Sequence, residues 1–216
     1  MINLHEFENR LTPRLLRVFG KLSSPPAIQA YLDSIPYIAE ELDRSPLRVM
    51  VDGQAHCLDG AIFAALALSR LGHRPLIMDL VPEPGTDDDH VLTIFSSHNR
   101  WGCIAKSNYA FLRFREPVYF NLRELAMSYF EAYTNNEKRK TLRGYTQPLD
   151  LSRFDSDWMW SEAGISEITR KFYSRKQVAL ISQDMSSDLS IADERFYAAN
   201  TLGTNFDWIF GVRDNS

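Results

Sequence analysis

The clearest pattern along the chain is a segment with almost no polar face, which runs from Leu58 to Leu71. It consists mainly of alanine and leucine, with a glycine near its start. A helix that is apolar on every side is normally buried, and small residues let other backbone segments approach it closely. Gly72 follows the segment and suits the end of a helix. The pattern therefore predicts a buried central helix.

Shorter apolar runs after this helix predict a small sheet. Residues 73–81 form one β-rich run, and residues 90–95 and 101–108 read as two strands of a hairpin. Residues 109–120 are a candidate for a third extended segment. Apolar residues at helical spacing return in 121–136, with Asn121 as the expected cap. Because further helical patterns precede the central helix, the order indicates an α+β fold.

The chain changes character at Leu149. An aromatic and acidic stretch begins there, and helical patterns follow around residues 165–173 and 191–202. Chemically reactive residue types do not gather in this part of the sequence. We therefore expect one α+β domain over residues 1–148 and a helical C-terminal extension over residues 149–216, which packs on this core or on a partner.

Composition narrows the class of protein without naming a function. The chain has 216 residues and a net charge of −4, which gives no general reason to expect binding to nucleic acid or to an anionic membrane. The charged N-terminal segment is unlike a secretory signal, and apolar runs stay shorter than the ~20 residues of a membrane span. We expect a cytoplasmic protein with two free cysteines. The sequence leaves its oligomeric state open.

One of these cysteines, Cys57, stands at the start of the predicted central helix. Free N–H groups and the positive end of the helix dipole favour an anion there, and a thiolate is the nucleophilic form of cysteine. The negative charge of Asp59 acts against this effect. Two interpretations stay open at this point: a nucleophile, or a small apolar residue of the core.

A catalytic thiol needs a base, and the chain has five histidines. His73 lies past the far end of the same helix, about 24 Å away. His98 lies at the hairpin tip, about 26 Å from the beginning of its strand. His56 is excluded on the rule that adjacent side chains of a helix do not face each other, and His5 belongs to a polar arm without an identifiable partner. His90 remains as the candidate base, with a satisfied surface histidine as the alternative.

The hairpin also suggests a residue that could orient His90. A two-residue turn at His98–Asn99 places Ser107 opposite His90, whereas a three-residue loop places Lys106 or Asn108 there. Lysine cannot accept a hydrogen bond from the imidazole, but the serine hydroxyl and the asparagine carbonyl can. We choose Asn108, whose amide reaches further, and keep Ser107 as the second candidate.

A cysteine that opens a buried helix, a histidine that starts a strand and a polar residue on the next strand follow one another in this order. In this respect the chain resembles the papain-like and transglutaminase-like superfamily. The resemblance is carried by AHCLDGAIFAALALSRLGHRPLIMDL, DDDHVLTIF and WGCIAKSN. Residues 46–145 are similar to a group of bacterial transglutaminase-like proteins. The resemblance implies a central buried helix packed on an antiparallel sheet, with Cys57 as nucleophile, His90 as general base and Asn108 as the orienting residue.

The sequence departs from the family pattern at two places. Transglutaminase-like enzymes usually carry an aspartate four residues after a tryptophan, and Ala105 stands at that position here. An asparagine as third residue suits a papain-type arrangement instead. Papain-like proteases also have a glutamine some six residues before the cysteine, whereas Gln54 is three residues before it. The backbone N–H of Cys57 is the better candidate for an oxyanion donor.

The resemblance implies acyl transfer or hydrolysis: a thiolate attacks an amide or ester carbonyl, and water or an amine resolves the acyl-enzyme. Such chemistry fits a cysteine peptidase, an amidase or an amine acyltransferase, and it requires no cofactor. The alternative is a catalytically silent module that binds a protein or peptide. The missing aspartate favours this alternative, as do aromatic residues of the C-terminal part: Phe154, Trp158, Trp160, Phe172 and Tyr173.

A third hypothesis concerns the acidic loop Asp87–His90. Adjacent carboxylates in a loop can hold a hard cation, although the fixed ligand spacing of a known metal site is missing here. The same carboxylates could instead keep His90 protonated and so favour a thiolate–imidazolium pair. We expect a solvated loop beside the active site rather than a metal site.

Overall fold

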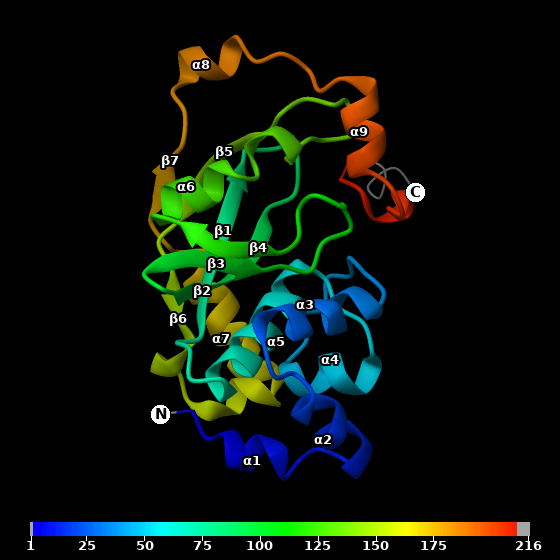
Figure 1. Ribbon diagram of the computed structural model, residues 1–216, viewed down its shortest axis with the longest axis vertical. Helices are drawn as coiled ribbons and strands as arrows, with labels where there is room; N and C mark the ends of the chain where they lie inside the picture. Colours follow the sequence, from blue (N-terminus) through cyan, green and yellow to red (C-terminus); the bar gives the residue numbers. More distant parts are fainter. Residues whose placement is uncertain (1, 211–216) are drawn as a thin grey trace.

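The computed structural model describes residues 2–210 as an antiparallel sheet with helices on both faces (Figure 1). The helices are α1 (Leu4–Glu8), α2 (Pro13–Gly20), α3 (Pro25–Ser34), α4 (Pro46–Asp52), α5 (Cys57–Arg70), α6 (Leu122–Met127), α7 (Glu162–Phe172), α8 (Gln183–Ser187) and α9 (Glu194–Asn200). Short 3-10 helices are η1 (Phe130–Ala132), η2 (Leu151–Arg153), η3 (Ser156–Met159) and η4 (Phe206–Trp208). The strands are β1 (Leu76–Pro82), β2 (His90–Ser97), β3 (Arg100–Ile104), β4 (Arg115–Tyr119), β5 (Leu142–Thr146), β6 (Leu149–Asp150) and β7 (Gln177–Ala179).

The strands form one sheet in the order β4-β3-β2-β1-β5-β7, and β6 also pairs with β1. Ser97 pairs with Arg100, so the β2–β3 hairpin closes through a two-residue turn. His98 and Asn99 have positive φ angles of 49° and 58°, as a type I′ turn requires. The shorter of the two turns that we considered is therefore the one that the chain forms.

Helix α5 packs against the middle of this sheet, and α3, α4 and α7 surround it (Figure 1). Residues 58 and 60–68 of the helix are buried, which confirms the predicted central helix. The hydroxyl of Thr93, on β2, donates a hydrogen bond of 2.5 Å to the carbonyl of Ala61. The α+β fold is confirmed, and a buried helix on an antiparallel sheet is compatible with a papain-like core.

The sheet separates two apolar cores. Val91 and Phe95 of β2 belong to the core that contains α5. Leu92 and Ile94 belong to the core on the opposite face, together with side chains of α6 and η1. Because side chains alternate along a strand, the even-numbered residues from 90 to 94 lie on the face opposite α5.

The C-terminal part is not purely helical. Its β6 pairs with β1 and its β7 pairs with β5, so residues after 148 complete the sheet. Trp158, Ile165, Ile168 and Phe172 are buried in the core around α5. The predicted boundary after residue 148 therefore lies inside the packed structure, because the segment beyond it supplies strands and core side chains.

The Asn121 side chain accepts a hydrogen bond of 2.9 Å from the N–H of Glu124, so the predicted cap of α6 is confirmed. Within residues 2–210, none of the helices has the length and apolar character that crossing a membrane would require.

Candidate functional site

Cys57 is the first residue of α5, and its side chain is half-buried at a pocket of about 180 Å³. The pocket wall combines carboxylates, aromatic rings and the start of the helix. It is lined by Tyr37, Ala39, Glu40, Glu41, Asp43, His56, Cys57, Leu58, Asp88, Asp89 and Tyr173. The predicted placement of a thiol at the beginning of a buried helix is confirmed.

His56 is the N-cap residue of α5 and shares the pocket with Cys57. Its backbone is extended, with φ −93° and ψ −170°, so it does not follow the helical spacing on which we excluded it. The N–H of Leu58 donates to its Nδ1 at 3.2 Å, and Asp59 accepts from its backbone N–H at 3.2 Å. This reciprocal capping box fixes both the backbone and the ring of His56.

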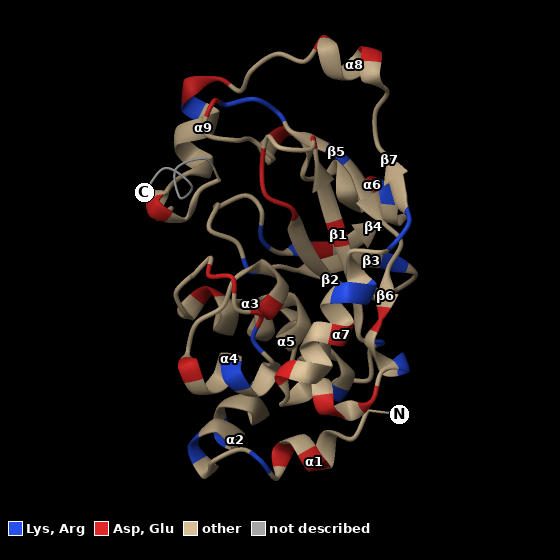
Figure 2. Ribbon diagram, turned by 180° about the vertical axis from the view of Figure 1, so that it is seen from behind, with Lys and Arg blue, Asp and Glu red and all other residues tan. Residues whose placement is uncertain are grey.

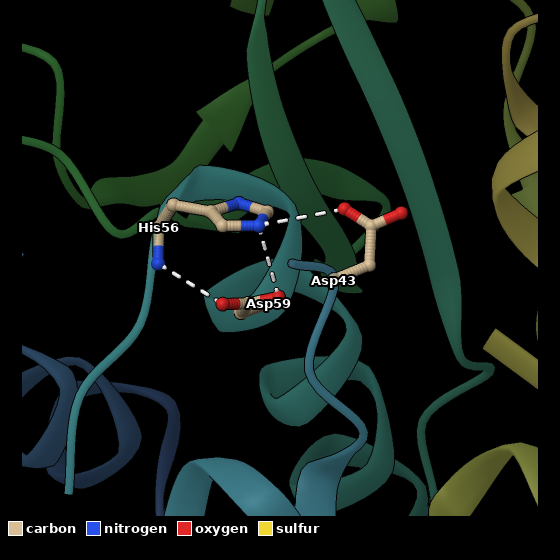
Figure 3. A group of neighbouring side chains, drawn as sticks. All are labelled: Asp43, His56 and Asp59. Carbon is tan, nitrogen blue, oxygen red and sulfur yellow. Dashed lines mark hydrogen bonds and ion pairs between the residues drawn. The ribbon is translucent and has the colours of Figure 1, made fainter. Parts of the chain in front are cut away.

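Two carboxylates contact Nε2 of this imidazole (Figure 3). Its Nε2 lies 3.1 Å from Oδ1 of Asp59 and 3.5 Å from Oδ1 of Asp43. Asp59 is fully buried within α5, whereas Asp43 precedes α4 and also accepts from the Thr169 hydroxyl at 2.8 Å. The ring is thus oriented from two separate elements of the fold.

The charges around His56 favour its protonated form. Burial alone would lower the pKa of His56, but hydrogen bonds with Asp43 and Cys57 and the charge of Asp59 outweigh burial and raise the pKa to about 10. Asp59 is itself supported by Arg44, whose backbone N–H donates to it at 2.6 Å and whose guanidinium lies 3.5 Å away. The carboxylates therefore favour an imidazolium at neutral pH, and this form gives up the bond that Nδ1 accepts from the N–H of Leu58, because both ring nitrogens of an imidazolium are donors.

The Cys57 thiol is subject to opposing influences. Burial raises its pKa above the ordinary value, and the negative charge of Asp89 acts in the same direction. The hydrogen bond with His56, its positive charge and the backbone N–H of Val91 lower the pKa. The resting sulfur is consequently a thiol whose ionisation depends on the neighbouring imidazolium.

Asp89 brings a second acidic pair to this pocket. Burial and the hydrogen bond to Asp89 raise the pKa of Asp79 on β1, and burial raises the pKa of Asp89. Asp79 is 5% exposed, and burial together with the neighbouring Asp89 favours its protonated form. Tyr173, just after α7, donates to Asp89 at 3.2 Å. Of this pair, Asp89 is the member whose negative charge raises the pKa of Cys57.

The structure does not bring His90 and Cys57 together. His90 lies on the sheet face opposite α5, where its Nε2 is 2.7 Å from the carbonyl of Leu112. Its ring stands edge-on to those of Tyr129 and Tyr133, with centroids 6.3 and 6.5 Å away. Burial lowers the pKa of His90 to about 4, so the ring is neutral at physiological pH. The geometry gives His90 a packing position instead of contact with the thiol.

Neither residue expected to orient His90 does so here. Ladder pairing between β2 and β3 ends at Thr93 and Ile104, before the strands reach His90. Asn108 forms hydrogen bonds with the backbone of Asn205, through both its amide nitrogen and its amide oxygen.

Ser107, the second candidate, is also engaged locally: its hydroxyl accepts from the N–H of Tyr109 at 3.0 Å.

In the acidic loop Asp87–His90, the carboxylate of Asp87 already accepts hydrogen bonds from other groups of the protein. Asp87 accepts from the Thr141 hydroxyl at 2.7 Å and from the N–H of Asp88 at 3.0 Å. Burial raises the pKa of Asp87 to about 6. These contacts tie the loop to the neighbouring segment before β5, and the His90 ring points away to Leu112, so the loop does not present a common set of ligand atoms.

Among residues 2–210, the group with metal-ligand spacing is Asp43, His56 and Asp59, whose ligand atoms all lie within 4.8 Å of one another. The donors of this group are already used within the protein. Both oxygens of Asp59 receive backbone N–H groups, and the guanidinium of Arg44 lies beside it. The arrangement fits an ionic cluster that holds an imidazolium better than a cation site.

Sequence reasoning missed His56 and Asp43. A signal for His56 was present, because a polar residue followed three positions later by an acid is the pattern of a capping box. His56 and Asp59 have that spacing directly before an apolar run. Asp43 gave no comparable signal, since its approach depends on the path of the chain between α3 and α4.

No protein-family model and no curated protein matches the chain. Among solved structures, it is similar to calcium-bound LapG of Legionella pneumophila, with a TM-score of 0.41, 11% identity, and coverage of 76% of this chain and 97% of that chain. For EGTA-treated LapG of the same organism the TM-score is 0.40 and the identity 12%, and the match covers 54% of this chain and 75% of that chain. A further LapG structure has a TM-score of 0.39 and 12% identity, and the match covers 53% of this chain and 76% of that chain. TM-scores and sequence identities this low indicate a similar course of the chain at most, and they carry no information about chemistry or ligands.

Proposed function

We propose that the chain is a thiol-dependent acyl hydrolase or acyltransferase, with Cys57 as nucleophile and His56 as its imidazole partner. The observation that carries the proposal is the shared pocket in which a helix-starting thiol meets an imidazole held by two carboxylates. A nucleophile, a base and a group that orients the base are the three parts that such chemistry requires. The substrate class is an amide or an ester.

The protons can be followed through one cycle. The cycle starts from the ion pair, in which His56 is an imidazolium and Cys57 has lost its proton to solvent, and the thiolate forms a bond to the carbonyl carbon of the substrate. The imidazolium then donates a proton to the departing amine or alkoxide as the carbon–heteroatom bond breaks. Water or an amine attacks the acyl-enzyme and gives up a proton to the neutral imidazole, and the carbon–sulfur bond breaks to release Cys57 as a thiolate beside the restored imidazolium. We assign the stabilisation of the oxyanion to the backbone N–H of Cys57, which lies at the positive end of α5.

The test is the rate of alkylation of Cys57 by iodoacetamide as a function of pH, with Cys103→Ser in every variant. His56→Asn is the informative change, because asparagine is a good N-cap residue and preserves the start of α5 while removing the imidazole. His73→Asn, at the other end of the same helix, is the matched control. We expect His56→Asn to react at least about tenfold more slowly at pH 7.5, since a rise of one pKa unit has this effect.

Equal rates for the two variants would contradict the proposal. They would favour the other candidate function, a catalytically silent module that binds a peptide. The observation that supports this candidate is the burial that raises the pKa of Cys57, because a thiol that stays protonated does not attack a carbonyl.

A further inference from the structure

A second cavity adjoins the Cys57 pocket and is closed by the C-terminal segment of the chain. The two cavities share Tyr37, Asp88 and Asp89 as a common wall. The second cavity also contacts Asn108 and the end of the described chain at residues 208–210. Only about 40 Å³ remains free beside this segment, so that another chain could enter only if the segment left.

Asn108 holds the segment by its backbone. Its Nδ2 donates to the carbonyl of Asn205 at 2.8 Å, and its Oδ1 accepts from the N–H of the same residue at 3.0 Å. The Thr204 hydroxyl adds a hydrogen bond of 2.8 Å to the carbonyl of Asn108. An amide side chain that pairs with both backbone groups of one residue recognises the backbone irrespective of the side chain. Asn205 is extended, with φ −84° and ψ 111°, and the 3-10 helix η4 follows it.

The segment is attached by few side chains. Within residues 204–210 only Ile209 is buried, and Phe206 is 52% exposed. The preceding helix α9 is fixed independently through Asn200. Its side chain donates to the Ala132 carbonyl at 2.8 Å and accepts from the N–H of Phe111 at 3.1 Å. The attachment of α9 therefore does not depend on residues 204–210.

We propose that the groove at Asn108 is a binding subsite for a peptide that presents one extended residue to Asn108, and that residues 204–210 of the chain itself, which continue into η4, occupy it until a substrate peptide displaces them. The ligand presents its backbone to Asn108 and places an aliphatic side chain where Ile209 now lies. The inference deepens the proposed function and rests on it, because the groove continues the pocket of Cys57. The C-terminal segment then acts as an internal competitor.

The test uses a chain that ends at Gly203 and a fluorescent peptide of residues 204–210, TNFDWIF. Binding is measured by fluorescence anisotropy, with a scrambled peptide as control. We expect saturable binding to the shortened chain and at least about tenfold weaker binding to the full chain, because a tethered segment competes at an effective concentration near ~1 mM. In the shortened chain, Asn108→Ala weakens binding about tenfold through the loss of two hydrogen bonds.

The proposal is overturned if the shortened chain, folded by circular dichroism, does not bind the peptide or binds the scrambled peptide equally well. It is also overturned if Asn108→Ala has no effect. If the shortened chain does not fold, Ile209→Asp in the full chain provides the same measurement, since a buried carboxylate expels the segment. Iodoacetamide reports the thiol separately: slow alkylation with specific peptide binding would contradict the proposed chemistry and leave the subsite intact.

Discussion

The side chains of His56 and Cys57 lie together in one pocket although the two residues are adjacent in the sequence. Inside a helix they would diverge, because successive residues are about 100° apart around the axis. His56 stands before the helix with an extended backbone, and the capping bond to Leu58 turns its ring over the first turn. The start of a helix can therefore place an imidazole beside a thiol from the neighbouring position. The acidic residues that line this pocket come from the segment between α3 and α4 and from the loop before β2, and Figure 2 marks the charged positions along the chain.

The first prediction concerns the pH dependence contributed by His56. Its folded pKa of about 10 is above the unfolded value of 6.5, so its stabilising effect is complete below pH 6.5 and is lost as pH rises toward 10. We expect the stability difference between the wild type and His56→Asn to shrink by a few kcal/mol across that window. Urea unfolding at pH 6, 8 and 10 measures it. A difference independent of pH would show that the ring is not held as an imidazolium.

The second prediction concerns His90, whose shift has the opposite sign. Its folded pKa of about 4 is below 6.5, so the unfolded chain takes up a proton first and stability is lost as pH falls from 6.5 to 4. His90→Gln retains a donor for the Leu112 carbonyl and removes the titration. Relative to the wild type, this variant should gain about 2 kcal/mol in unfolding free energy between pH 7 and pH 4.5.

The same variant distinguishes the two candidate bases. Alkylation of Cys57 should proceed at the wild-type rate in His90→Gln, because the ring lies on the far face of the sheet. A loss of thiol reactivity as large as that expected for His56→Asn would restore His90 as the base.

The parts of the fold that the sequence predicts are those set by local physics. The uniformly apolar run fixes α5, and the turn at His98–Asn99 follows from two residues that tolerate positive φ. The cap at Asn121 depends on a hydrogen bond between two residues that are three positions apart. Each of these features is decided within a few positions of the residues that show it.

The misplaced parts of the site depend on longer relationships. The face of a strand on which His90 lies changes with a shift of one residue, and the loop of residues 83–89 between β1 and β2 is too long for its sequence to fix that register. The partner of Asn108 comes from position 205, 97 residues further along the chain, and sequence spacing carries no information about it. His56 was excluded by a rule for helix interiors that does not hold at a helix cap.

The third prediction compares the two carboxylates that hold His56. Asp59 is fully buried and bonded to Arg44 and His56, so Asp59→Asn should lower the unfolding free energy by about 3 kcal/mol, as expected when a buried charge loses its partner. Asp43 is partly exposed, and Asp43→Asn should cost about 1 kcal/mol or less. Chemical unfolding at pH 7 compares them. If both substitutions lowered the unfolding free energy equally, the deeper burial of Asp59 would not make it the more important of the two carboxylates.

The fourth prediction concerns the support of α5 one turn after Cys57. A Cβ at Gly60 would overlap the Cβ of Lys106, and this lysine cannot swing away because its Nζ donates to the carbonyls of Leu32 at 2.7 Å and Ile35 at 2.5 Å. Gly60→Ala should therefore lower the unfolding free energy by about 3 kcal/mol, at the upper end of the cost of overpacking.

Gly20→Ala is the matched control for this substitution. Gly20 ends α2 without a positive φ, and nothing lies within 4 Å of the position that its Cβ would take. Alanine there should be neutral or stabilising by up to about 1 kcal/mol, because it restricts the unfolded chain. Urea unfolding of both variants gives the comparison, and iodoacetamide alkylation shows whether α5 has moved. If Gly60→Ala were as stable as Gly20→Ala, the close packing of α5 against Lys106 would not be what holds Cys57 in its pocket.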